Sequence, residues 1–327
     1  LYGKLFGPLD LSAFTTKLND RAGAGDATRG ASDDDNYYLA VKWQAAPQVA
    51  VTPWVGLSRR NTDNAAAATG YELYYLALHA QAKVGLMDLA AQVIFETGDA
   101  AQPTAARRLA GDRDVDIEAW ALQVRSWFTF GNLKVGLFFT YLSGDDDQVT
   151  ATGNTAQQSD RTLNRFVFPT SAGYLQGPNI LTGRRWSTII TDQGGLAGSG
   201  NTTSLRTGIG EGSLNNPNGI VMPEILVKYE LTPTLTLEGG VSFIRSAKKA
   251  PDIGATLTGP STAATTFDNA KNFGTAFEAG FRWKIYNELT LDMVGSYLAA
   301  GDYGVVQNTG RAKDDAWAIY YEFKYTW

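Results

Sequence analysis

The chain ends with the sequence WAIYYEFKYTW, which runs from Trp317 to Trp327. Every second residue of this stretch is large and apolar, whereas the residues between them include Glu322 and Lys324. Successive side chains of a β-strand point to opposite faces of its sheet. The alternation therefore predicts a strand with one apolar face and one more polar face.

The same alternation recurs along the whole chain and predicts twelve strands. They are expected at residues 9–18, 36–46, 49–60, 71–84, 88–97, 117–130, 133–143, 220–231, 235–246, 272–286, 289–300 and 315–327. Tight turns are expected at Pro47-Gln48, Gly85-Leu86-Met87, Gly131-Asn132, Thr232-Pro233-Thr234 and Asn287-Glu288. Wide loops are expected at 19–35, 61–70, 98–116, 144–219, 247–271 and 301–314. Residues 1–7 resemble the end of a further strand that turns at Gly7-Pro8.

Short turns that alternate with long loops predict an all-β fold, a transmembrane antiparallel up-and-down β-barrel. We expect about 12 strands, or 14–18 if N-terminal hairpins are missing or the longest loop holds a hairpin. Residues 1–327 would form one barrel, with loop 144–219 extracellular or folded inward. Lipid offers no hydrogen-bond partners, so a spanning sheet must close on itself. A soluble β-sandwich is the alternative, but its strands are usually only about five to six residues long.

Composition excludes several classes of protein. The 28 Lys and Arg residues and 33 Asp and Glu residues give a net charge of −5, which argues against nucleic acid as a partner. The absence of cysteine excludes disulfides and thiolate metal sites. No run of 18 apolar residues is present, so no transmembrane helix is encoded. We expect no cofactor and no resident metal.

His79 is the one histidine of the chain, and we expect it to face the lumen as a polar lining residue. A hydrolase would need a serine near it, and none lies beside it in the sequence. The prediction is therefore that the protein is not an enzyme and has no catalytic residue.

Acidic clusters occur at Asp33-Asp34-Asp35, at 112–116 and at Asp145-Asp146-Asp147, in regions expected to be long loops. We interpret them as solvated surface charge. Calcium that bridges the loops, or that binds them to lipopolysaccharide phosphates, is the alternative because calcium takes several carboxylate and carbonyl oxygens.

The alternation also predicts which side chains face lipid and which face the lumen. Large apolar residues such as Phe277, Trp283 and Phe323 are expected to face lipid, and aromatic girdles are expected at both interfaces. The predicted pore-lining residues are Lys42, Lys83, Glu96, Arg125, Lys134, Glu224, Lys228, Glu238, Glu278, Arg282, Lys284, Asp292, Glu322 and Lys324. With Asp10 and Glu230 added, eight cations balance eight anions, so the predicted wall has no positive excess.

The loop at 144–219 is too long for an ordinary connection. It contains Phe166, Phe168 and Tyr174, which a disordered segment would avoid. We expect it to fold over or into the barrel and to constrict the pore, or alternatively to form an extra hairpin. Its arginines would then bring positive charge to the pore mouth: Arg161, Arg165, Arg184 and Arg185.

The terminal run Tyr320–Trp327 resembles the assembly signal of Gram-negative outer-membrane porins, although most of that family end in Phe. The porin resemblance covers the whole chain and implies a cell outer-membrane location. The strand exits at 95–99, 141–145 and 297–302, and the segment 165–170, resemble alginate-export-type porins. Members of that family would be expected to have more strands than twelve.

The resemblance implies a channel for passive diffusion of small hydrophilic solutes, with acidic sugars as candidates. A barrel scaffold or sheath for a partner protein, such as an electron-transfer or export complex, is the alternative. Expected partners are outer-membrane lipid, lipopolysaccharide and small hydrophilic solutes, with further copies of the chain as a candidate. The chain opens on Leu1 without a signal peptide, from which we expect a processed chain or a missing N-terminal part.

Overall fold

The computed structural model describes residues 2–6, 8–20, 32–62, 71–100, 115–144, 162–164, 166, 219–248, 271–301 and 315–326. These residues form one sheet. Its strands are β1 (Tyr2–Phe6), β2 (Leu9–Asp20), β3 (Ser32–Ala46), β4 (Val49–Thr62), β5 (Tyr71–Val84), β6 (Met87–Ala100), β7 (Val115–Phe130), β8 (Leu133–Leu142), β9 (Thr162–Leu163), β10 (Ile220–Thr232), β11 (Leu235–Arg245), β12 (Asn272–Lys284), β13 (Leu289–Ala300) and β14 (Ala316–Tyr325). In these ranges no helix has the length and apolar character needed to cross a membrane.

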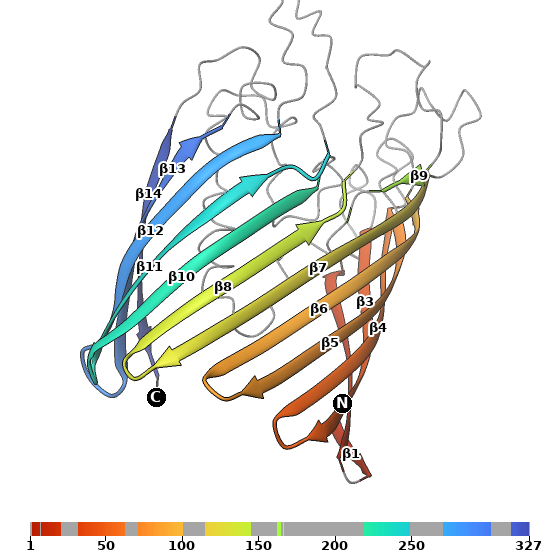
Figure 1. Cartoon of the computed structure of the whole chain (residues 1–327). Coiled ribbons are helices and arrows are strands. Elements are labelled where there is room, and N and C mark those ends of the chain that lie inside the picture. The colour runs from red at the N-terminus through yellow and green to blue at the C-terminus, as the bar shows by residue number, and fades with distance from the viewer. Residues whose placement is uncertain are drawn as a thin grey trace, which may run out of the picture.

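Each strand pairs in an antiparallel way with the next strand along the chain, from β1 to β14 (Figure 1). Only the two-residue β9 lies off this path, where it pairs in parallel with β7. The twelve expected strands correspond to β2–β8 and β10–β14, which confirms the all-β, antiparallel up-and-down architecture. β1 pairs with β2, as the first residues of the chain predict.

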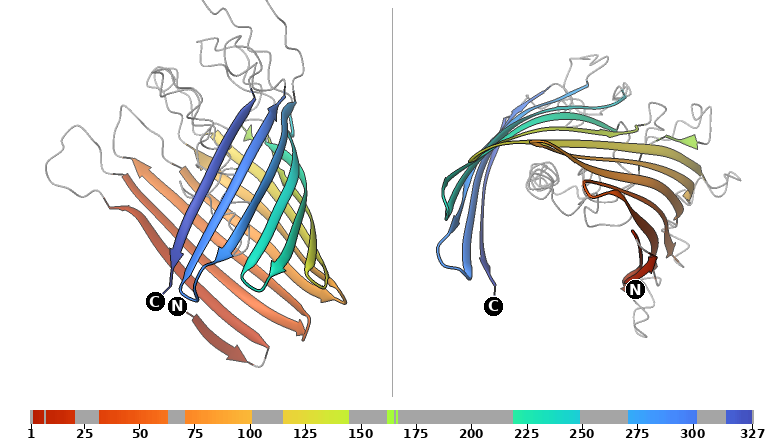
Figure 2. Two further views of the ribbon diagram at one scale, coloured as in Figure 1. Left: turned by 90° about the vertical axis from the view of Figure 1, so that its left-hand side faces the viewer. Right: turned by 60° about the horizontal axis from the view of Figure 1, so that its bottom comes forward.

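The tight turns lie together at one end of the sheet, where both chain termini also lie (Figure 2). Gly85 and Gly131 each begin such a turn with φ near +60°, a backbone conformation that L side chains seldom adopt. The turn expected at Asn287-Glu288 is wider than predicted. It covers residues 285–288, and the backbone N–H of Ile285 donates to the carbonyl of Leu289 over 2.9 Å.

Several strands extend further toward the long loops than the alternation predicts. β3 begins at Ser32, four residues before its expected start, and β7 begins at Val115, two residues before its expected start. The added residues are mostly polar, so they show no alternation of apolar and polar side chains. The backbone pairing between the strands nevertheless continues through them. The cluster Asp33-Asp34-Asp35, expected in a loop, therefore lies within β3, where Asp35 is the register neighbour of Arg59 of β4. Opposite charges at such neighbouring positions stabilise the pairing of two strands.

The sheet is strongly curved, but its two outer strands do not meet (Figure 2). β1 and β14 are not hydrogen-bonded to each other, so the sheet built by the described residues is an open one. The expected closure is absent because β1 has only five residues and pairs only with the turn-side end of β2, between Leu9 and Ser12.

Candidate functional site

The register divides the sheet into two faces of opposite character. Along one row, Leu237, Phe281 and Met293 are direct neighbours on one face. The exposed large apolar side chains lie on this convex outer face, and Leu76 is 60% and Trp317 75% exposed. Exposure of so many large apolar side chains to water is unfavourable, so this face is suited to contact with the hydrocarbon of a membrane.

The outer face carries a continuous band without a charged residue. In β5 the band runs from Tyr74 to Val84, through Leu76 and Leu78. A rise of ~3.3 Å per residue gives this stretch a length of about 33 Å, or about 25 Å across a bilayer at a tilt of ~40°. This is the height of the apolar band of an outer-membrane barrel.

Charged residues return to the outer face only at the long-loop end of the described strands. Neighbouring positions there form a row that we call the charged collar: Asp35, Arg59, Glu72, Asp99 and Asp116. Arg59 lies 3.6 Å from the Glu72 carboxylate, and both side chains are substantially exposed. The collar therefore marks where the apolar band ends.

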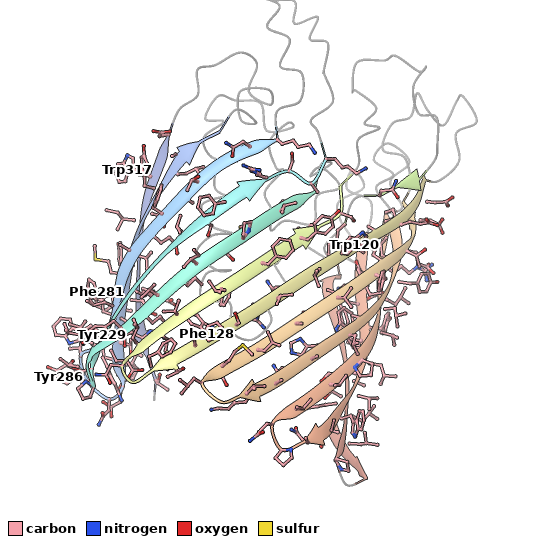
Figure 3. All side chains as sticks on the ribbon, viewed as in Figure 1. Trp120, Phe128, Tyr229, Phe281, Tyr286 and Trp317 are labelled. Atoms are coloured by element: carbon pink, nitrogen blue, oxygen red, sulfur yellow. The ribbon has the colours of Figure 1, made fainter. Side chains whose placement is uncertain are left out.

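Aromatic side chains follow both edges of the apolar band (Figure 3). Trp120 and Trp317 lie toward the long loops, and Trp120 stacks on Tyr141 with ring centroids 4.4 Å apart. Phe128, Tyr229, Phe281 and Tyr286 lie toward the turns. Two girdles of this kind are characteristic of barrels in lipid, so the two faces are those of an outer-membrane barrel wall.

The structure places all fourteen predicted pore-lining residues on the opposite, concave face, which we call the inner face. Lys134, Lys228 and Glu238 are neighbours in one row across β8, β10 and β11. Arg282, Asp292 and Glu322 are neighbours in another row across β12, β13 and β14. His79 also lies on this face, beside Thr52 and Gln92. The lining of a pore by these residues remains a prediction.

Asp292 is the centre of an ion-pair network on the inner face. Its side chain is only 1% exposed. The Arg282 guanidinium donates to both of its carboxylate oxygens, over 2.6 Å from Nε and 2.9 Å from Nη2. Lys324 Nζ lies 3.5 Å from Asp292 and 3.1 Å from Glu322. A buried carboxylate is stable only with partners of this kind, so these charges largely neutralise one another.

Other carboxylates of β10–β14 are held by neighbours in the same way. The Ser242 hydroxyl donates to Glu224 over 2.9 Å, and the Ser296 hydroxyl donates to Glu278 over 3.0 Å. Lys228 Nζ lies 3.9 Å from Glu238. Each of these carboxylates therefore has a polar or charged partner on a neighbouring strand of the inner face.

Lys228 Nζ also lies 5.4 Å from the ring centroid of Trp127. The Trp127 ring lies against Gly136, where an added Cβ would come within 2.9 Å of it. Trp127 and Asp88 both belong to the inner face, as direct neighbours in the register. The sequence analysis missed both residues, although parity carried to the first residues of β6 and across β7 would have found them.

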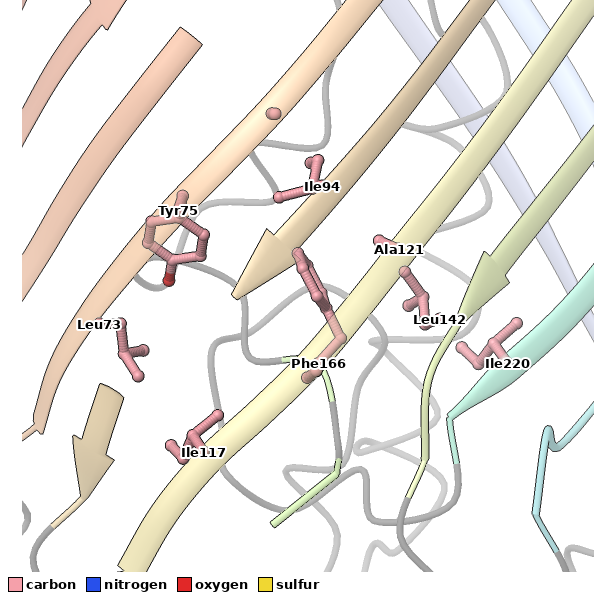
Figure 4. Close-up of a cluster of buried hydrophobic side chains, with 10 residues drawn as sticks. Leu73, Tyr75, Ile94, Ile117, Ala121, Leu142, Phe166 and Ile220 are labelled. Atoms are coloured by element: carbon pink, nitrogen blue, oxygen red, sulfur yellow. The ribbon is translucent and has the colours of Figure 1, made fainter. Parts of the chain in front are cut away.

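An apolar patch covers the long-loop end of the inner face (Figure 4). Its buried members come from β5, β6, β7, β8 and β10, and Phe166 packs among them: Leu73, Tyr75, Ala77, Ile94, Ile117, Ala119, Ala121, Leu142 and Ile220. The backbone N–H of Phe166 donates to the carbonyl of Ser143 over 3.1 Å. Ser143 in turn accepts a bond from the N–H of Trp120 through its hydroxyl, over 2.9 Å.

Phe166 brings one piece of the 144–219 segment against the inner face, and β9 joins the sheet itself beside β7. Arg161, Arg165, Arg184 and Arg185, the arginines expected at a constriction, lie outside the described residues. The clusters at 112–114 and 145–147 lie outside them as well, so calcium binding stays an untested alternative.

No protein-family model and no curated protein matches the chain. The resemblance to alginate-export-type porins therefore rests on the short motifs alone. Among solved structures, the chain is similar to the outer-membrane protein opdK from Pseudomonas aeruginosa, with 12% identity, 99% of this chain and 68% of that chain covered, and a TM-score of 0.48.

The corresponding values for Acinetobacter baumannii OccAB4 are 11% identity, 98% of this chain, 62% of that chain and a TM-score of 0.48. The siderophore receptor PirA of Pseudomonas aeruginosa is similar with 10% identity and a TM-score of 0.46, and the match covers 91% of this chain and 40% of that chain. The chain thus spans less than half the length of PirA and less than two thirds of OccAB4. Likenesses at this level say nothing about solute or activity, so our functional conclusion rests on the two faces of the sheet.

Proposed function

We propose that the chain forms the wall of an outer-membrane channel through which small hydrophilic solutes diffuse passively. One observation carries this proposal: the uncharged apolar band covers the outer face, whereas the inner face carries charged rows such as Arg282–Asp292–Glu322. A membrane-spanning wall needs apolar residues only toward lipid. Charged side chains toward the lumen serve to admit water and polar solutes.

Constriction of this channel by the 144–219 segment is the second part of the proposal. The docking of Phe166 on the inner face supports it, because burial of an aromatic side chain helps to offset the entropy lost when a long segment is ordered. Arg161, Arg165, Arg184 and Arg185 would then add positive charge near the pore mouth. Acidic sugars are the solutes that such a mouth would favour.

The charged collar is the proposed contact with lipopolysaccharide. Asp35, Glu72 and Asp99 lie just beyond the apolar band, where lipid head groups would be if the band spans the hydrocarbon. Their carboxylates would reach lipopolysaccharide phosphates through divalent cations, and Arg59 would reach them directly. We also propose that further copies of the chain associate with it, although we assign no interface to this contact.

Single-channel recording in a planar lipid bilayer tests the channel. The purified protein should give steady openings with a linear current–voltage relation, and deletion of residues 150–210 with a short Gly/Ser link should raise the conductance. Absence of openings in protein that is shown to be inserted would contradict the channel and favour a scaffold or sheath for a partner protein. Unchanged conductance after the deletion would contradict the constriction alone.

A further inference from the structure

A cavity of about 400 Å³ lies on the inner face near the turn-side end of β3–β7. We call it the turn-side basin. Its lining includes the three cations Lys42, Lys83 and Arg125, from β3, β5 and β7. Pockets that hold small organic molecules have volumes of this order, ~300–1,000 Å³.

The shape of the basin follows from one row of residues across five strands. Gln44, Ala50, Gln81, Ala90 and Arg125 are successive neighbours in this row, from β3 to β7. Two alanines alternate with three long polar side chains, so the alanine positions leave the space and the long side chains surround it. All five residues line the cavity.

The basin has a local positive excess that the balanced wall does not reveal. Among the described residues that line it, Asp88 is the one acidic residue, against three cations. Lys83 lies 3.9 Å from Asp88, but both side chains are more than half exposed, so this pair is weak. Lys42 and Arg125 form no ion pair with any residue that the structure describes.

The contrast with the Asp292 network shows why the basin can take a ligand. Arg282 and Lys324 already share the carboxylates of Asp292 and Glu322. An incoming anion would have to displace these contacts. In the basin, by comparison, Asp10 of β2 is the register neighbour of Lys42 but does not line the cavity, and within the described residues neither Lys42 nor Arg125 forms an ion pair that an anion would have to displace.

We propose that the turn-side basin is a binding subsite for a small hydroxylated carboxylate, the chemical class of the sugar acids. The carboxylate would lie between Lys42 and Arg125, with charge-assisted hydrogen bonds. The Gln81 amide can both donate to and accept from sugar hydroxyl groups. The Gln44 Nε2 already donates to the carbonyls of Ala46 and Val49, over 2.7 Å and 3.3 Å, so Gln44 would offer its Oε1 as an acceptor. Phosphate can also bond to an amide, but it lacks a carbon chain of hydroxyl groups that could reach both amides while its charge stays near a cation.

The basin is suited to binding a solute weakly during its passage through the channel, and not to holding it tightly. Exposed lysines and a partly open basin bind an anion weakly, and a conducting site must release its solute as readily as it takes it up. The role of the basin in solute passage rests on the proposed channel function. Binding to the basin itself does not depend on conduction, so the two can be tested apart.

Calorimetric titration of the whole chain in detergent micelles tests the subsite directly. The probes are sodium glucuronate, inorganic phosphate and glucose. Glucuronate should bind more tightly than phosphate, and glucose more weakly than either. The double substitution Lys42→Gln and Arg125→Gln should weaken glucuronate binding about tenfold or more, since a tenfold change corresponds to only ~1.4 kcal/mol. Gln81→Ala should weaken glucuronate binding more than phosphate binding, because several hydroxyl groups of glucuronate can use this amide.

Two matched variants control this experiment. Lys284→Gln removes one positive charge from the same end of the inner face, but outside the basin, and should alter glucuronate binding by less than about twofold. The charge-preserving pair Lys42→Arg and Arg125→Lys should retain most of the binding, which also shows that the basin tolerates substitution.

Equal glucuronate binding by the native chain and the Lys42→Gln, Arg125→Gln variant would overturn the subsite. So would the lack of glucuronate binding by a native chain whose channel conducts. Phosphate that binds as tightly as glucuronate would overturn the assignment to hydroxylated carboxylates. Glucuronate binding by a chain that does not conduct would instead contradict the channel and leave the subsite in place.

Discussion

Asp292 shows how one residue decides the charge that a solute would meet on the inner face. The carboxylate is buried at 1% exposure and holds both Arg282 and Lys324. Alternation alone places these residues on the inner face, but it does not show that one carboxylate binds two cations. That contact depends on the order of β12, β13 and β14 in the sheet.

Asp292→Asn should make the channel more selective for anions. The substitution removes one negative charge and leaves Arg282 and Lys324 without their shared partner, so the field near this row becomes more positive. The reversal potential in a potassium chloride gradient measures this shift. Asp292→Glu keeps the charge and is the control. A reversal potential that Asp292→Asn leaves unmoved would show that this row does not face the conduction path.

Leu78 and His79 are consecutive residues of β5 that lie on opposite faces of the sheet. Leu78→Arg places a charge near the middle of the apolar band and should lower the free energy of unfolding from lipid by about 2–4 kcal/mol. His79→Arg adds a similar side chain among polar neighbours and should cost much less. Denaturant titration of the protein in lipid vesicles measures both, and equal costs would show that the faces are wrongly assigned.

At the scale of elements, the strands follow from period two but the short segment at 162–166 does not. β9 has only two residues, and its parallel pairing with β7 involves a partner far away in the sequence. The hydrophobic character of Phe166 predicted that it packs at the mouth of the lumen, but it did not show which residues would receive it. The patch that receives it is assembled from five strands.

Phe166→Ala should loosen this segment and make the channel noisier. Truncation of a buried phenylalanine typically costs about 3–5 kcal/mol, here mostly at the expense of docking on the inner face. Single-channel recordings should therefore show more frequent conductance changes than those of the native protein. Trp317→Ala removes an aromatic residue from the outer face and serves as the control. Equal noise from both variants would argue against a docked segment.

At the scale of the whole molecule, the sequence predicts the meander and the two faces because lipid leaves few alternatives. A spanning strand needs an apolar side, and each tight turn carries the parity into the next strand. The sequence does not predict the clustering of unpaired cations in the basin, since Lys42 and Arg125 lie on strands separated by three others. Nor does it predict the open edge between β1 and β14.

The two faces of the wall can be tested directly because the native chain contains no cysteine, so labelling of introduced cysteines has no background. Single cysteine substitutions at positions 78 to 83 of β5, in protein reconstituted into lipid vesicles, would be exposed to a water-soluble thiol reagent. We predict strict alternation: positions 79, 81 and 83 react, and positions 78, 80 and 82 are protected by lipid. Equal reactivity at all six positions, or the reverse alternation, would contradict a wall with lipid on its outer face and water on its inner face.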